Sequence, residues 1–131
     1  MKLISSEMWC VAALSLILLA LTAVQGVQVP LVQGLKWGLG SRDDPREETV
    51  LQGRFSRTVN NHVEAMLIFV PLMLLAIHQG ISNDMTRLSA QLVIGGRLAF
   101  IPLYLAGVFA LRSLAFGVSL VGVAILVVQL L

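Results

Sequence analysis

The sequence predicts an all-α integral membrane protein, a bundle of four transmembrane helices in a single domain over residues 1–131. The chain is 57% hydrophobic and only 12% charged, and its mean hydropathy is +0.89, values far more apolar than those of soluble domains. A membrane-spanning helix needs about 20 apolar residues, and four such helices fit if two of the uncharged stretches join across Arg97. Those stretches cover residues 8–35, 65–83, 88–96, 98–111 and 113–131.

The first span is expected over residues 7–35. Its uncharged run is longer than the apolar region of a secretory signal peptide, which has about 7–15 residues, so we expect this segment to stay in the protein as a helix. Trp9 and Trp37 flank the span, as aromatic residues do at the two faces of a bilayer. The polar loop that follows, over residues 36–52, contains glycines, paired aspartates and a proline, which favour a solvated connection.

The remaining spans are expected over residues 53–79, 84–110 and 113–131. The connection before the third span is short, and either Asn83 or Asp84 is suited to cap that helix. The connection before the fourth span, over residues 107–113, is tighter still. The sequence therefore predicts an up-and-down bundle with one long loop.

The orientation follows from the basic residues near the ends of the spans, because cytoplasmic loops carry an excess of Lys and Arg. The side that holds the loop 36–52 carries most of them, whereas the other side has only Lys2 and Arg87. We therefore expect the loop to be cytoplasmic and both termini to lie outside. The basic residues on the loop side are Lys36, Arg42, Arg46, Arg54, Arg57 and Arg112.

Polar side chains inside the second span share one helix face, although ionisable groups are costly at membrane depth. They are spaced by three and four residues, which places side chains on the same side of a helix. Such a stripe marks either a functional site or a structural pair. Its members are Arg54, Arg57, Asn61 and Glu64.

The third span carries a second stripe of Arg97, Phe100 and Tyr104. Because the two helices run in opposite directions and each rises about 1.5 Å per residue, we expect Tyr104 at the level of Asn61 and Arg97 within reach of Glu64.

Two interpretations of these stripes stay open. In the first, Glu64 and Arg97 form a structural ion pair that sets the helix register. In the second, the stripes wall an anion-binding cleft in which Arg54, Arg57 and Arg112 bind carboxylates. Glu64 would then bind a ligand ammonium group.

Other ligands and partners have less support in the sequence. Neither His62 nor His78 lies on the polar stripe, and no cysteine or second carboxylate is spaced to help them, so we expect no metal site. The single Cys10 excludes an intramolecular disulfide. The net charge of +2 comes largely from loop arginines, so it is a signal of membrane topology and we expect no nucleic-acid partner.

Several motifs together resemble one family, the membrane-associated proteins in eicosanoid and glutathione metabolism (MAPEG). Residues 53–64, with the sequence GRFSRTVNNHVE, are similar to its signature of an arginine, an asparagine four residues later and a glutamate seven residues later. Residues 96–104 resemble the family's arginine followed by aromatic residues, and residues 111–114 resemble the start of its fourth helix. Residues 40–44 are similar to a loop of bacterial-type members, which points to a bacterial inner membrane.

The resemblance implies a homotrimer that binds glutathione as co-substrate between neighbouring protomers, near the cytoplasmic edge. Arg112 would be the catalytic residue that stabilises the glutathione thiolate. Glutathione-using members carry a glutamine and two tyrosines where this chain has Val59, Ala65 and Phe100. The implied glutathione-binding residues are Arg54, Arg57, Asn61, Glu64 and Tyr104.

Three functions remain open at this point. The first is a glutathione-dependent transferase or peroxidase that acts on lipophilic electrophiles drawn from the bilayer. The second is a catalytically silent accessory or scaffold protein of the same fold. The third is a small transporter or proton relay, which is disfavoured because the chain shows no inverted repeat.

Overall fold

The computed structural model describes residues 4–131, which form helices and no strand, so the predicted all-helical class is confirmed. Four of the five helices are long and apolar enough to cross a membrane, and the fifth, α2, is a single turn. The bounds are α1 Ser6–Gln33, α2 Leu35–Gly38, α3 Val50–His78, α4 Asp84–Ala106 and α5 Phe109–Leu130.

Capping residues set the helix boundaries. α3 starts at Val50, before the expected residue 53, because Thr49 and Gln52 form a capping box in which each side chain bonds the other residue's backbone N–H. Asn83 caps α4 through the backbone N–H groups of residues 85 and 86, as one of the two predicted caps. α4 ends at Ala106 rather than at residue 110, because Gly107 adopts φ +77°, a left-handed conformation that ends a helix.

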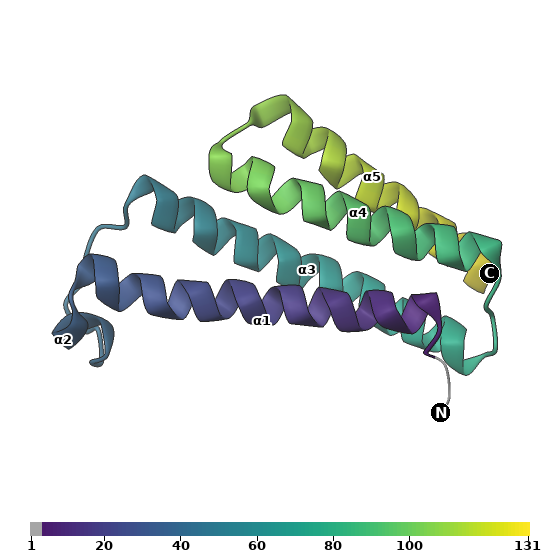
Figure 1. The fold of residues 1–131 in the computed structure, drawn as a ribbon, viewed down its shortest axis with the longest axis horizontal. Coiled ribbons are helices and arrows are strands. Elements are labelled where there is room, and N and C mark those ends of the chain that lie inside the picture. Colours follow the sequence, from purple (N-terminus) through teal and green to yellow (C-terminus); the bar gives the residue numbers. More distant parts are fainter. Residues whose placement is uncertain (1–3) are drawn as a thin grey trace.

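The long helices form two antiparallel pairs, α1 with α3 and α4 with α5, and the two pairs pack against each other (Figure 1). One end of the bundle, the loop end, holds α2, the loop 39–49 and the α4–α5 connection. The other end, the terminal end, holds the α3–α4 turn and the C-terminus, with the chain entering α1 beside them (Figure 1). The cytoplasmic assignment of the loop end stays a prediction, and Lys2, which contributed to it, lies outside the described residues.

Small residues bring α4 and α5 into close contact. A Cβ atom added at Gly96 would lie 2.8 Å from the carbonyl oxygen of Ala115, and one added at Gly122 would lie 2.9 Å from that of Ser89. The Ser89 hydroxyl also donates to the Gly122 carbonyl at 2.7 Å. Helices in lipid associate through this kind of close backbone approach and through interhelical hydrogen bonds.

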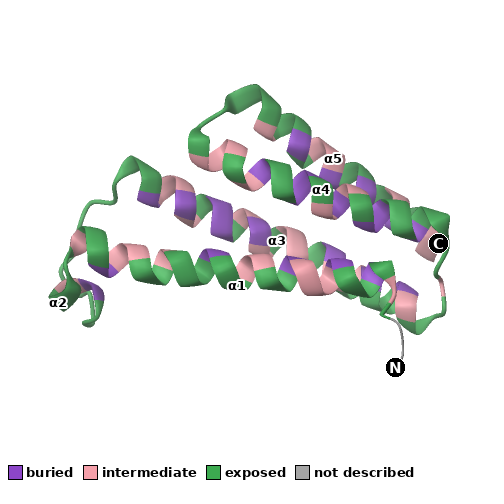
Figure 2. Ribbon diagram, in the orientation of Figure 1, coloured by how far each residue is buried: buried purple, intermediate pink, exposed green. Residues whose placement is uncertain are grey.

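The core consists of two apolar clusters along the inner faces of the helices (Figure 2). The larger cluster includes Leu14, Phe69, Met73 and Leu126, which come from α1, α3 and α5 and are almost fully buried. Large apolar side chains cover the outer faces, where lipid would surround a membrane protein. Examples of these exposed residues are Leu16, Leu19, Leu67, Leu114 and Val128.

The close contact between α4 and α5 can be tested with adjacent glycines. We expect Gly96→Ala to lower the melting temperature in detergent, at a cost of about 1–3 kcal/mol, because the added methyl group meets the backbone of α5. Gly95→Ala is the matched control, since a Cβ atom there meets nothing within 4 Å. Equal melting temperatures for the two variants would contradict the packing described here.

Candidate functional site

Two arginines and a tyrosine from three helices meet at the loop end. Arg57 on α3 donates through Nε to the Tyr104 hydroxyl on α4 at 3.1 Å. The guanidinium of Arg112 on α5 lies over the Tyr104 ring, 4.6 Å from its centroid. Tyr104 therefore orients both cations at once, through its hydroxyl and through its ring face. We call Arg57, Tyr104 and Arg112 the upper cluster.

Arg54 lies beside this cluster but makes a structural contact. Its Nη1 donates to the Leu105 carbonyl at 3.3 Å, one of the last carbonyls of α4. A Cβ atom at Gly107 would lie 2.7 Å from Arg54 Nη2, so the missing side chain at Gly107 makes room for the guanidinium. A cation at the carbonyl end of a helix stabilises that end, and Arg54 thereby holds α3 against the end of α4.

A second group of polar residues, the lower cluster, lies deeper in the bundle around Arg97. The Arg97 side chain is fully buried. Its Nη1 donates to Asn61 Oδ1 at 2.7 Å, and its Nε donates to His62 Nδ1 at 3.3 Å. The guanidinium also lies over the Phe100 ring, 4.5 Å from the centroid. The lower cluster is thus Arg97 with two neutral partners, Asn61 and His62.

The contacts of His62 define its tautomer. Nε2 lies 3.0 Å from the carbonyl oxygen of Leu14 on α1, and a carbonyl can only accept, so Nε2 carries the proton. Nδ1 is then the acceptor that the Nε–H of Arg97 requires. His62 is therefore a neutral imidazole that connects α1, α3 and α4 through one buried side chain.

The ion pair expected between Glu64 and Arg97 is not formed, and that prediction was wrong. Within residues 4–131 the one ion pair joins Arg87 to Asp84, at 3.2 Å on the surface. Arg97 contacts Asn61, one helical turn before Glu64, and Tyr104 contacts Arg57 rather than standing level with Asn61. The α3 residues that meet Arg97 and Tyr104 thus lie about one turn nearer the loop end than expected.

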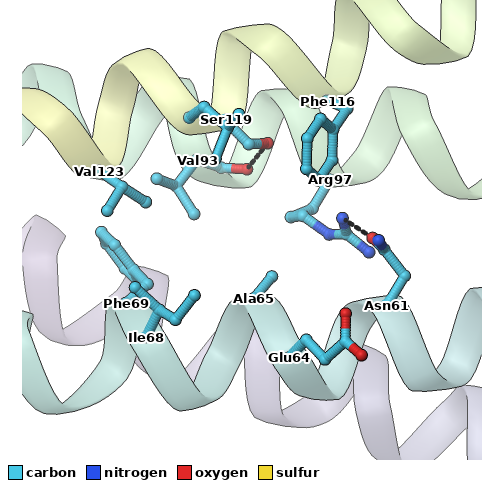
Figure 3. Close-up of a pocket in the computed structure, with 11 residues that line it drawn as sticks. Asn61, Glu64, Ala65, Ile68, Phe69, Val93, Arg97, Phe116, Ser119 and Val123 are labelled. Atoms are coloured by element: carbon cyan, nitrogen blue, oxygen red, sulfur yellow. Dashed lines mark hydrogen bonds between the residues drawn. The ribbon is translucent and has the colours of Figure 1, made fainter.

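Glu64 and Arg97 nevertheless line the same cavity, which has a volume of about 130 Å³ and lies between α3, α4 and α5 (Figure 3). Asn61 shares its polar end, and the other walls are apolar except for Ser119. The apolar lining residues include Phe69, Val93 and Phe116. Glu64 itself is exposed on the protomer and forms none of the hydrogen bonds found among the described residues.

Two of the buried polar residues, His62 and Glu7, are ionisable and were not expected from the sequence to be buried. His62 lies off the polar stripe of α3, and it has partners only because the packed bundle brings Leu14 and Arg97 next to it. Glu7, near the start of α1, is buried and accepts hydrogen bonds from the hydroxyl groups of Ser82 at 2.8 Å and Thr86 at 2.9 Å. A charged residue inside an otherwise apolar span was the available signal for Glu7.

Comparison with known families now decides the relationship. A family model described as the MAPEG family matches residues 7–131. The chain belongs to the MAPEG family. Searches of curated proteins and of solved structures found no match. With four helices that are long and apolar enough to cross a membrane, this MAPEG chain is a multi-pass integral membrane protein.

The position of the lower cluster inside the membrane-spanning helices explains its chemistry. Asn61 and Arg97 stand near the middle of α3 and α4, and so at the depth of the hydrocarbon core. A guanidinium at that depth needs hydrogen-bond acceptors from the protein itself, and Asn61 and His62 provide them.

In residues 4–131 no group of three histidine, cysteine, aspartate or glutamate residues could hold a metal ion.

The role of His62 can be tested by removing its acceptor. We expect His62→Leu to lower stability by about 1–3 kcal/mol, because the Nε–H of Arg97 loses its partner inside the bundle. His62→Gln retains an acceptor oxygen and should recover part of that loss. The control is His78→Leu at the exposed end of α3, and melting curves in detergent measure all three. A His62→Leu protein as stable as His78→Leu would contradict the assignment.

Proposed function

We propose that this MAPEG protein is a glutathione-dependent transferase or peroxidase that acts on lipophilic electrophiles, with Arg112 stabilising the glutathione thiolate. The observation that carries the proposal is the convergence of Arg57 and Arg112 on Tyr104 at the loop end. No carboxylate within residues 4–131 forms an ion pair with these arginines, so their charges are available to an anionic ligand.

Glutathione suits such a site, because it carries two carboxylates and a thiol. Arg57 is exposed and uses only Nε to bind Tyr104, which leaves its two Nη nitrogens for a carboxylate. Arg54 lies one turn earlier and adds positive charge beside it. Asn61 and Glu64 lie deeper on the same helix, and the Glu64 carboxylate would accept a hydrogen bond from the ligand's amino group.

In this proposal Arg112 lowers the pKa of the glutathione thiol. It lies at the start of α5, whose N-cap residue, Val108, offers no side-chain hydrogen bond to the first turn. The uncapped N–H groups of that turn add partial positive charge to that of the guanidinium. An ordinary thiol has a pKa of about 8.5 and becomes a thiolate at neutral pH when cations lower this value.

The exposed Glu64 supports assembly into a homotrimer. A carboxylate near the middle of a membrane-spanning helix is costly when it faces lipid. Glu64 is exposed on the single protomer, so a neighbouring copy that covers this face of α3 would remove the cost. The same copy would close the glutathione site at the loop end.

A second function is favoured by two buried residues. Val59 packs with Leu21 and Phe55 in the smaller apolar cluster, and Phe100 packs beneath Arg97. Both stand at positions where glutathione-using relatives carry hydrogen-bonding side chains. The alternative is therefore a catalytically silent accessory or scaffold protein of the same fold.

Glutathione binding separates these two functions. We expect millimolar glutathione to raise the melting temperature of the detergent-solubilised protein, because a ligand at ten times its Kd stabilises the folded state by about 1.4 kcal/mol. S-methylglutathione should stabilise it similarly, since both carboxylates remain. An unchanged melting temperature with both ligands would favour the accessory protein.

The role of Arg112 requires a separate measurement. We expect Arg112→Ala to keep most of the thermal stabilisation by glutathione but to lose at least about tenfold in conjugation of a model aryl halide at pH 7. Without the cation the pKa of the bound thiol rises, and each unit is a factor of ten in thiolate at a pH well below that pKa. Accordingly, the ultraviolet absorbance of the bound thiolate should appear only at higher pH.

Arg87→Ala is the control for Arg112→Ala, because Arg87 lies in the exposed ion pair near the start of α4, at the terminal end. It should retain both the activity and the pH profile. An Arg112→Ala protein with unchanged thiolate absorbance and unchanged rate would overturn the assignment of Arg112.

A further inference from the structure

Two side chains of opposite charge lie over a glycine near the start of α3. A Cβ atom added at Gly53 would lie 3.3 Å from Arg57 Nη1, 3.7 Å from Arg57 Nη2 and 3.7 Å from Glu48 Oε2. The missing side chain at Gly53 thus makes room for both charged groups. The two Nη nitrogens are those that remain for a ligand carboxylate, because Nε of Arg57 donates to Tyr104.

The backbone on both sides of Glu48 is fixed by hydrogen bonds. The carbonyl of Glu47 accepts from Gln33 Nε2 at 2.9 Å, which ties the end of the loop to α1. On the other side Thr49 belongs to the capping box of α3, and its backbone N–H donates to Gln52 Oε1 at 2.9 Å. The side chain of Glu48 therefore extends from a defined position at the start of α3.

The Glu48 carboxylate lowers the positive potential at Arg57 without pairing with it. Both side chains are exposed, and the one ion pair within residues 4–131 joins two other residues. Each charged group lies within 4 Å of the same point over Gly53, so the two are closer together than the Debye length of about 8 Å at physiological ionic strength. An anion bound to the Nη nitrogens of Arg57 is therefore attracted by the guanidinium and repelled by the carboxylate.

The size of this repulsion depends on the charge of the bound group. The Coulomb energy between the Glu48 carboxylate and an anion is proportional to the charge of the anion, so it is larger for a phosphate dianion than for a carboxylate. Arginine by itself binds carboxylate and phosphate groups in the same bidentate way. A carboxylate of the protein at this place therefore favours a ligand group with a single negative charge.

We propose that Glu48 is a specificity-determining residue of the site at the loop end, where it selects a carboxylate over a compact dianion such as phosphate. The inference rests on the proposed function, because it concerns the ligand group that Arg57 binds. It adds to that function a residue of the loop before α3, and it leaves the roles of Arg112 and Glu64 unchanged.

Binding of inorganic phosphate to the full chain in detergent tests the inference. At pH 8 phosphate is largely a dianion, and the saturable rise of the melting temperature with its concentration, at constant ionic strength, gives an apparent Kd. We expect Glu48→Gln to bind phosphate about tenfold more tightly than the unaltered protein but glutathione only about threefold more tightly, because the removed repulsion is proportional to charge. General effects of phosphate on folding are common to all variants and cancel in the comparison.

Glu47→Gln is the matched control. It removes the same charge from the adjacent position, whereas the atoms nearest the point over Gly53 belong to Arg57 and Glu48, so it should change both Kd values less than Glu48→Gln does. Equal phosphate affinities of the two variants would overturn the inference. Weaker glutathione binding by Glu48→Gln would also overturn it, since the carboxylate would then hold the ligand's ammonium group.

The variant Arg57→Gln shows whether the effect acts through the arginine. In that background we expect Glu48→Gln to bring no gain in phosphate affinity, because the effects of two residues that act on one ligand group are not additive. A gain as large as in the unaltered background would overturn the inference. Absence of glutathione binding by the unaltered protein would count against the proposed function alone, because the phosphate measurements decide the role of Glu48 by themselves.

Discussion

The bundle depends on the burial of one guanidinium. Arg97 stands in the middle of α4 with no exposed surface, at a depth where a bare cation would oppose folding. Two of its three nitrogens donate to neutral acceptors, Asn61 and His62 on α3, and His62 in turn binds the backbone of α1 at Leu14. Three helices are thus joined through a single hydrogen-bonded chain, and that chain sets the register between α3 and α4.

The two polar clusters differ in what their side chains are free to bind. The lower cluster is neutral apart from Arg97 and is closed by contacts within the protomer, so it is suited to holding the helices together. One or two turns nearer the loop end, the same two helices bring Arg57 to Tyr104, and the close α4–α5 hairpin brings Arg112 over its ring. The upper cluster therefore concentrates positive charge where an anionic ligand can reach it.

Glu64 belongs to neither cluster within the protomer. Because Arg97 is already engaged by Asn61 and His62, the Glu64 carboxylate stays free on the protomer, although Glu64 and Arg97 line the same cavity. Opposite charges that share a cavity without pairing create a polar end in an otherwise apolar space. The same arrangement makes Glu64 available to a neighbouring copy or to a ligand, whereas a closed ion pair would have removed it from both.

The sequence by itself determined the fold class, the four spans, the residues of both polar stripes and the MAPEG relationship, because hydrophobic run length and helical spacing are local properties. The tertiary structure decided which polar residues meet. On α3, Arg97 meets Asn61 and His62 rather than Glu64, because the pairing of side chains from two helices depends on how segments distant in the sequence pack together. Helical periodicity indicates which face of a helix a residue occupies. Which residues on the facing sides of two helices come into contact depends on how the bundle packs.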